Sequence, residues 1–234
     1  MKKITISLLF VLFLCQISIA QKDNAPFNYY IWGNATYNNI GGDFDGKGIY
    51  SAEGHGYEHT IILPDFKPAV GWEIGFGVSK GNHSLNIALG YTKFNNATFE
   101  DYSDLSWIDE IKDAYLGYYE ANYGYRFFNK KRLNVSGLIG LGVNTKSANE
   151  TYEASFATGI TKYEDINVNF GINMEYNVTR RIFLNTTVMY KLSNHSSVEI
   201  SSASIDEYNI SGLNGNWLSI NFGVGVKLGK TEAL

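Results

Sequence analysis

The 234-residue sequence lacks several features that define common protein classes. Its single cysteine, Cys15, lies near the start, so the rest of the chain can form no disulfide bond. It has only three prolines, so long strands can run without interruption. Beyond residue 20, no segment approaches the roughly 20 apolar residues that a membrane-spanning helix requires. Its 19 basic residues are fewer than its 23 acidic residues, which argues against nucleic acid as a partner.

The first 20 residues have the pattern of a secretory signal peptide. Lys2 and Lys3 precede an apolar run over residues 4–15, and Ser18 and Ala20 place small residues where a signal peptidase cuts. The run is too short for a membrane-spanning helix. We therefore predict a signal peptide at 1–20 and one secreted domain at 21–234. Without the two lysines the formal net charge changes from −4 to −6.

The remaining chain repeatedly alternates large apolar residues with small or polar ones. In the last such segment, Leu218, Ile220 and Phe222 alternate with Ser219 and Asn221. Successive side chains of a strand point to opposite faces, so this segment has one apolar and one polar face. The same pattern predicts eight strands, at residues 27–39, 68–79, 83–92, 114–128, 132–144, 162–178, 182–193 and 217–229.

The connections between these strands are short and long in strict alternation. Tight turns at 80–82, 129–131 and 179–181 alternate with four long connections, which therefore lie at one end of the sheet. Residues 93–113 are predicted as a loop, whereas Ile49, Tyr50 and residues 59–63 favour strand extensions within the first loop. An even strand number with short turns and long loops predicts an all-β, eight-stranded antiparallel up-and-down transmembrane β-barrel.

The size of the side chains indicates which face lies outside. A soluble, lipocalin-like barrel would place the apolar face inside. An eight-stranded interior is only just wide enough for side chains to fill it, so the small polar set belongs inside. Aromatic residues also gather near both ends of the strands, as two lipid interfaces would select. The two sets are Tyr37, Trp72, Tyr91, Tyr115 and Tyr190 at the loop end, and Tyr29, Phe76, Tyr125, Phe127 and Tyr176 at the turn end.

The alternating strands, the signal peptide and the final strand NFGVGVKLG resemble the small outer-membrane β-barrel proteins of the OmpA/OmpX type. The asparagine- and tyrosine-rich composition resembles members from Bacteroidota-like bacteria. The resemblance implies an outer-membrane location, assembly by the barrel-assembly machinery, and contact with outer-membrane lipid and lipopolysaccharide. Members commonly end on an aromatic residue, whereas this chain continues past the strand through residues 230–234 and has no aromatic end.

Six charged residues fall on the inward face of the predicted strands. They are Glu73, Glu120, Arg126, Glu175, Lys191 and Lys227. Charges in so narrow an interior lose water and need partners. Counting along the strands places Arg126, Glu175 and Lys227 in one cluster near the turn end. The same count places Glu73 and Glu120 at mid-depth, with no lysine or arginine at their level. They could reach Arg126 through strand stagger, bind water or hold a shared proton. We predict a barrel plugged by such side chains.

Two loop segments weakly resemble chemical sites. His195, Ser197 and Glu199 could activate a serine, as in outer-membrane lipid A deacylases, but Val198 stands where that family has asparagine. Asp43 and Asp45 precede a glycine, yet the spacing of a calcium-binding EF-hand is absent. His55 and His59 are interpreted as surface residues. We therefore predict no catalytic residues, no cofactor and no metal.

The sequence leaves three functions open. The favoured one is a structural or surface-interaction protein with a plugged polar interior and acidic extracellular loops. One alternative is a narrow, porin-like conduit for small solutes, because the fold hosts both roles. The third is a lipid A-modifying hydrolase, which rests only on the His195 segment.

Overall fold

The computed structural model describes residues 26–44, 49–54, 57–62, 64–94, 97–98, 108–152, 157–201 and 205–228. Eight long strands form its wall: β1 (Asn28–Ile40), β5 (Ala69–Lys80), β6 (His83–Phe94), β8 (Ile108–Asn129), β9 (Leu133–Tyr152), β10 (Ala157–Asn177), β11 (Ile182–Ser201) and β13 (Trp217–Leu228). Five shorter strands lie in the long connections: β2 (Ile49–Gly54), β3 (Tyr57–Ile62), β4 (Asp65–Phe66), β7 (Ala97–Thr98) and β12 (Ile205–Asn214). Among the described residues, no helix has the length and apolar composition needed to cross a membrane.

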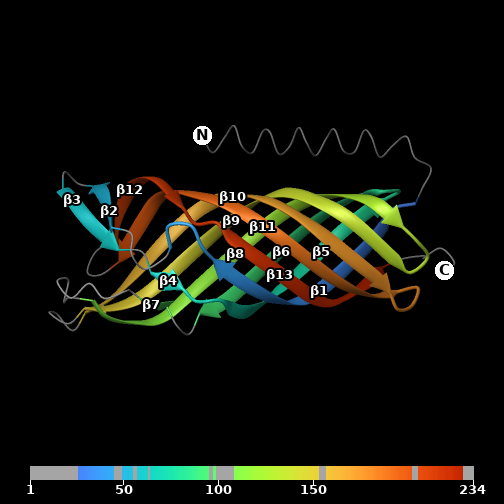
Figure 1. Ribbon diagram of the computed structural model, residues 1–234, viewed down its shortest axis with the longest axis horizontal. Coiled ribbons are helices and arrows are strands. Elements are labelled where there is room, and N and C mark those ends of the chain that lie inside the picture. Colours follow the sequence, from blue (N-terminus) through green and yellow to red (C-terminus); the bar gives the residue numbers. More distant parts are fainter. Residues whose placement is uncertain are drawn as a thin grey trace.

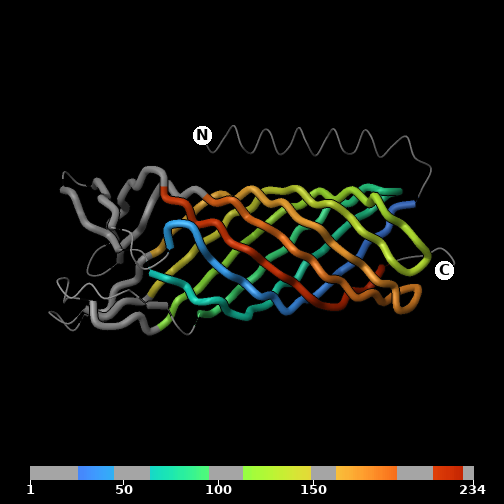
Figure 2. Tube along the Cα trace, in the orientation of Figure 1, coloured from blue at the N-terminus to red at the C-terminus, as the bar shows by residue number. Residues whose placement is uncertain are grey.

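The wall is a closed antiparallel barrel, as the alternation predicts. Its strands follow the order β10-β9-β8-β6-β5-β1-β13-β11, and β10 also pairs with β11, which closes the circle. The strands run obliquely around a long axis, with the three tight turns at one end and β2, β3 and β12 at the other (Figure 1). We call these the turn end and the loop end. Tyr29 pairs with Leu228, so the first strand begins and the last strand finishes at the turn end (Figure 2).

The apolar face of the wall points outward, as predicted. Large apolar side chains on the outer face of every wall strand are exposed, among them Ile31, Ile74, Phe170 and Val224. The opposite face carries buried polar residues such as Glu73 and Asn169, next to Ile74 and Phe170. Some aromatic side chains predicted as girdles contact one another across neighbouring strands. Trp72 and Tyr91 have ring centroids 6.3 Å apart, and Tyr91 and Tyr115 are separated by 5.7 Å.

The turn end agrees closely with the predicted boundaries, whereas the loop end does not. Residues 108–113, predicted as loop, begin β8, and β9, β10 and β11 also extend beyond their predicted limits. The strand β12 was not predicted at all, while the pairing of Ile49 with Ile62 confirms the predicted extension in the first loop. Alternation marks a strand only where one face is apolar. Backbone pairing can continue above that belt with no such sequence signal.

Glycines allow large side chains to enter the narrow interior. A Cβ atom on Gly75 would lie 2.2 Å from the Trp32 ring, and one on Gly90 would lie 2.1 Å from the Tyr118 ring. These glycines therefore leave the space that the two inward rings occupy on the neighbouring strands. Gly81, in the turn between β5 and β6, adopts a φ of +57°, which glycine tolerates without steric cost.

Candidate functional site: the barrel interior

The interior of the barrel has three levels. At the loop end lies a cluster of buried apolar and aromatic side chains, which we call the aromatic plug. A network of polar side chains fills the middle, and a cavity lies at the turn end. The aromatic plug consists of Ile40, Phe44, Phe66, Phe94, Ala114, Leu116, Tyr118, Tyr163, Leu213 and Trp217.

The aromatic plug is built from wall strands, from β12 and from the loop that follows β1. Phe44 and Phe66 come from that loop region, and their ring centroids are 5.5 Å apart. Phe44 also packs edge-on against Tyr163 at 5.1 Å, and Phe66 contacts Phe94 at 5.3 Å. All four rings are buried, with exposed fractions of 1% or less. The predicted interior of small polar residues is therefore wrong at this level, where large apolar side chains fill the lumen.

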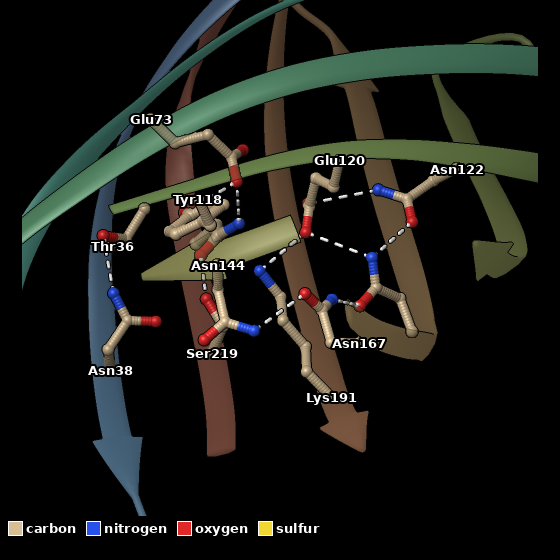
Figure 3. A network of polar contacts seen from close by, with 12 residues as sticks. Thr36, Asn38, Glu73, Tyr118, Glu120, Asn122, Asn144, Asn167, Lys191 and Ser219 are labelled. Carbon is tan, nitrogen blue, oxygen red and sulfur yellow. Dashed lines mark hydrogen bonds and ion pairs between the residues drawn. The ribbon is translucent and has the colours of Figure 1, made fainter. Parts of the chain in front are cut away.

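Below the plug, the carboxylate of Glu73 is surrounded by neutral donors. It accepts hydrogen bonds from Asn34 at 2.8 Å, the Tyr118 hydroxyl at 3.0 Å and Asn221 at 3.0 Å. The Trp32 indole N–H adds a longer bond of 3.3 Å. These donors come from β1, β8 and β13, so one carboxylate from β5 joins strands around the barrel (Figure 3). Hydrogen bonds of this number stabilise a buried carboxylate that, within the described part of the chain, has no cation in direct contact.

The second mid-depth carboxylate, Glu120, forms an ion pair across the lumen. Its Oε2 lies 2.7 Å from the Nζ of Lys191, and both side chains are almost completely buried (Figure 3). The approach is that of an ion pair, without the alignment of a hydrogen bond. Asn122 and Asn169 donate to the two Glu120 oxygens at 3.1 and 3.2 Å. The prediction that no lysine or arginine lies at the level of Glu120 is wrong, because strand tilt and the long lysine side chain bring Lys191 of β11 to Glu120 of β8.

Two buried lysines mark the boundary between the network and the plug. The Nζ of Lys191 lies 3.8 Å from the Tyr118 ring centroid and 5.1 Å from that of Trp217. The Nζ of Lys146 lies 4.8 Å from the same Trp217 ring and donates to the Asn144 side chain at 2.8 Å. Each ammonium thus faces aromatic rings on one side and polar groups on the other. A buried cation gains from both kinds of contact.

At the turn end, the structure brings together the three residues predicted as a cluster. Lys227 Nζ lies 2.7 Å from Glu175 Oε1, and it also donates to Asn177 at 2.6 Å. Asn134 donates to the same Glu175 oxygen at 3.1 Å. Arg126 lines the same cavity, but its guanidinium forms no ion pair with any residue in the described ranges. The structure therefore places all six predicted charges on the inward side of the wall. Four of them form the ion pairs Glu120–Lys191 and Glu175–Lys227, whereas Glu73 and Arg126 form no ion pair with any described residue.

The predicted loop sites lie largely outside what the structure describes. The backbone of His195, Ser197 and Glu199 belongs to β11 and that of His59 to β3, but the side chains of these four residues are outside the described set. Asp45 and His55 lie outside the described residues altogether. The Asp43 carboxylate accepts a hydrogen bond from the Asn214 backbone N–H at 2.8 Å. It therefore ties the first loop to the end of β12. No metal-binding group of three or more His, Cys, Asp or Glu side chains occurs among the described residues.

No protein-family model and no curated protein matches the sequence. Solved structures match its fold. The outer membrane protein OprG from Pseudomonas aeruginosa superposes with a TM-score of 0.57 at 8% identity, over 88% of this chain and 98% of its own. A major outer membrane protein from Thermus thermophilus gives 0.56 at 9% identity, over 86% and 99%. The outer membrane protein AlkL, solved in DMPC lipid bilayers, gives 0.52 at 12% identity, over 91% and 95%.

At sequence identities of 8–12%, the structural similarity establishes the fold alone. The chain has the fold of the small outer-membrane β-barrels, which confirms the resemblance seen in its alternating strands. Its outward apolar belt is that of a barrel that spans a membrane.

Proposed function

We propose that the protein is an integral outer-membrane barrel with a closed interior, which holds acidic loops at the cell surface. The aromatic plug carries this proposal, because its rings occupy the lumen at the end where the long loops emerge. The pair of Glu120 and Lys191 and the bonds to Glu73 occupy the next level. An eight-stranded barrel has little interior space beyond its side chains. The barrel is therefore a scaffold, with neither a general diffusion pore nor a catalytic site.

The charges of the connections support an outward-facing loop end. Residues 38–66 contain five acidic residues and one lysine, and residues 95–113 contain six and one. The tight turns are instead basic, with Lys80, Lys130, Lys131, Arg180 and Arg181. Acidic loops at the surface can share divalent cations with the phosphates of lipopolysaccharide, and they give the loops a surface suited to cationic partners. In this function the loops make the contacts, and the rigid wall presents them.

A cysteine in a long loop should be accessible from outside the cell. Ser103→Cys is expected to react with a membrane-impermeant maleimide on intact cells, because residue 103 lies in the acidic third connection of the predicted topology. The matched control is Lys130→Cys in a tight turn, which should react only after the outer membrane is permeabilised. Because the chain has no cysteine after Cys15, each variant of the processed protein carries one reactive thiol. The reverse labelling pattern would contradict the proposed surface role.

A further inference from the structure

The turn end of the lumen contains a cavity that the scaffold role does not use. Its volume is about 220 Å³, and it lies between inward side chains of the wall and residues of the tight turns. A second, smaller cavity of about 60 Å³ lies deeper in the barrel. It shares the lining residues Tyr30, Arg126 and Glu175 with the first. The space therefore narrows inward from the turn end, as a binding pocket does.

The charge of this cavity is strongly unbalanced. Arg126, Lys131, Arg180 and Lys227 line it, against a single carboxylate, that of Glu175. The Glu175 carboxylate does not neutralise the other three cations, because it pairs with Lys227 at 2.7 Å and accepts a hydrogen bond from Asn134. Three cationic side chains thus share one small space with no carboxylate bound to any of them in the described ranges.

Arg126 is the innermost of these three cations. Its Nε is buried and has no hydrogen-bond partner among the described residues. An unsatisfied buried donor of a charged group is costly, and an incoming acceptor would remove that cost. The lining also contains the side chains of Asn28, Asn129, Asn134 and Asn177, whose amides can donate to an anion.

We infer that this cavity, which we call the turn-end pocket, is a binding site for a small phosphate-bearing anion. A phosphate group at neutral pH carries close to two negative charges and several acceptor oxygens, which matches three free cations better than a single carboxylate does. The planar guanidinium of Arg126 can bind two of those oxygens at once. The volume would hold about seven waters at roughly 30 Å³ each, which suits inorganic phosphate or a short phosphate ester.

The probe for this site is inorganic phosphate, titrated calorimetrically into the purified full-length mature barrel in a nonionic detergent. The wild type is expected to bind phosphate saturably. Arg126→Met should weaken binding about tenfold or more, which is the loss expected for a charge-assisted hydrogen bond. The matched control is Arg132→Met, because Arg132 is exposed at the same end and does not line the pocket. This control should remain within about twofold of the wild type, as its charge acts only at long range.

A second variant keeps the test valid if Arg126→Met fails to fold. Arg180→Met changes an exposed residue of the same lining and should also weaken phosphate binding severalfold. Repeating the titration in nanodiscs distinguishes the source of the phosphate group. A lipid headgroup as occupant predicts weaker apparent binding in phosphatidylcholine discs than in nonionic detergent, because the lipid supplies its own phosphate, and a free phosphate predicts equal binding. Absence of saturable binding, or equal weakening by Arg126→Met and Arg132→Met, would overturn the assignment.

Discussion

Replacing Glu120 with glutamine is expected to lower the free energy of unfolding by about 3–5 kcal/mol, because it leaves the buried ammonium of Lys191 without its anion. The amide retains one oxygen, so it can accept a hydrogen bond from either Asn122 or Asn169 but not from both, and the loss reports on the charge together with one hydrogen bond. The double variant Glu120→Gln with Lys191→Met should recover most of the stability, since the cation that needed a partner is gone. Denaturant titration of the barrel in lipid vesicles measures the wild type and both variants.

An exposed ion pair of the same kind provides the control. Lys93 and Asp113 form an ion pair between β6 and β8 near the loop end, and both side chains are about one-third exposed or more. Exposed pairs contribute about 0–1 kcal/mol, so Asp113→Asn should change the stability little. A loss at Glu120 no larger than the loss at Asp113 would show that the mid-depth pair does not hold the strands together. The same conclusion would follow if the double variant were as unstable as the single one.

The second large effect is expected on the outer face. Phe170 lies midway along the apolar stretch of β10, and its side chain is 43% exposed, so it faces the lipid. Phe170→Arg should cost about 2–4 kcal/mol of folding free energy, because an arginine at the bilayer midplane must leave water. Tyr176→Arg is the matched control on the same strand and face, at the turn-end girdle, where the cost falls to about 0–1 kcal/mol. Folding into vesicles after dilution from urea gives both values.

Equal costs at the two positions would contradict the assigned depth of the membrane belt. A cost that appears in detergent micelles as well as in bilayers would point instead to a local packing defect around residue 170. The comparison therefore tests the membrane-facing assignment separately from the stability of the interior.

The wall of this barrel could be predicted because each of its strands separates lipid from a narrow lumen. That requirement produces a two-residue alternation in the sequence, as in Phe170, Ile172 and Met174, with Gly171 and Asn173 between them. The tight turns were equally clear, since they join two alternating segments directly. The predicted boundaries therefore agree with the structure where the strands lie within the apolar belt.

The aromatic plug could not be predicted in the same way. Phe44 and Phe66 belong to a glycine-rich, acidic connection, and nothing local indicates that such a loop returns into the lumen. Trp217 and Leu116 lie at inward positions, where their apolar character breaks the expected polar face. That break was the available signal, because a large apolar residue on the inward face needs an apolar neighbour inside the barrel.

The mid-depth ion pair was missed for a geometric reason. Counting residues from each turn treats the strands as parallel to the barrel axis, whereas strands of a closed barrel are tilted and staggered. The level of Lys191 relative to Glu120 depends on the total stagger around the barrel, which the sequence does not state. The pair of Glu175 and Lys227 lies beside the turn at 179–181, because the end of β13 donates from Lys227 N to Arg181 O, so counting from that turn placed both residues correctly.

The ionic current through the purified barrel in a planar lipid bilayer tests the central claim most directly. If the aromatic plug and the network of Glu73, Glu120 and Lys191 close the lumen, insertion of the wild-type protein should produce no current above that of the protein-free membrane. Insertion is verified independently by protease protection of the reconstituted protein. Steady channels that also pass small sugars would contradict the closed interior and establish the barrel as a conduit.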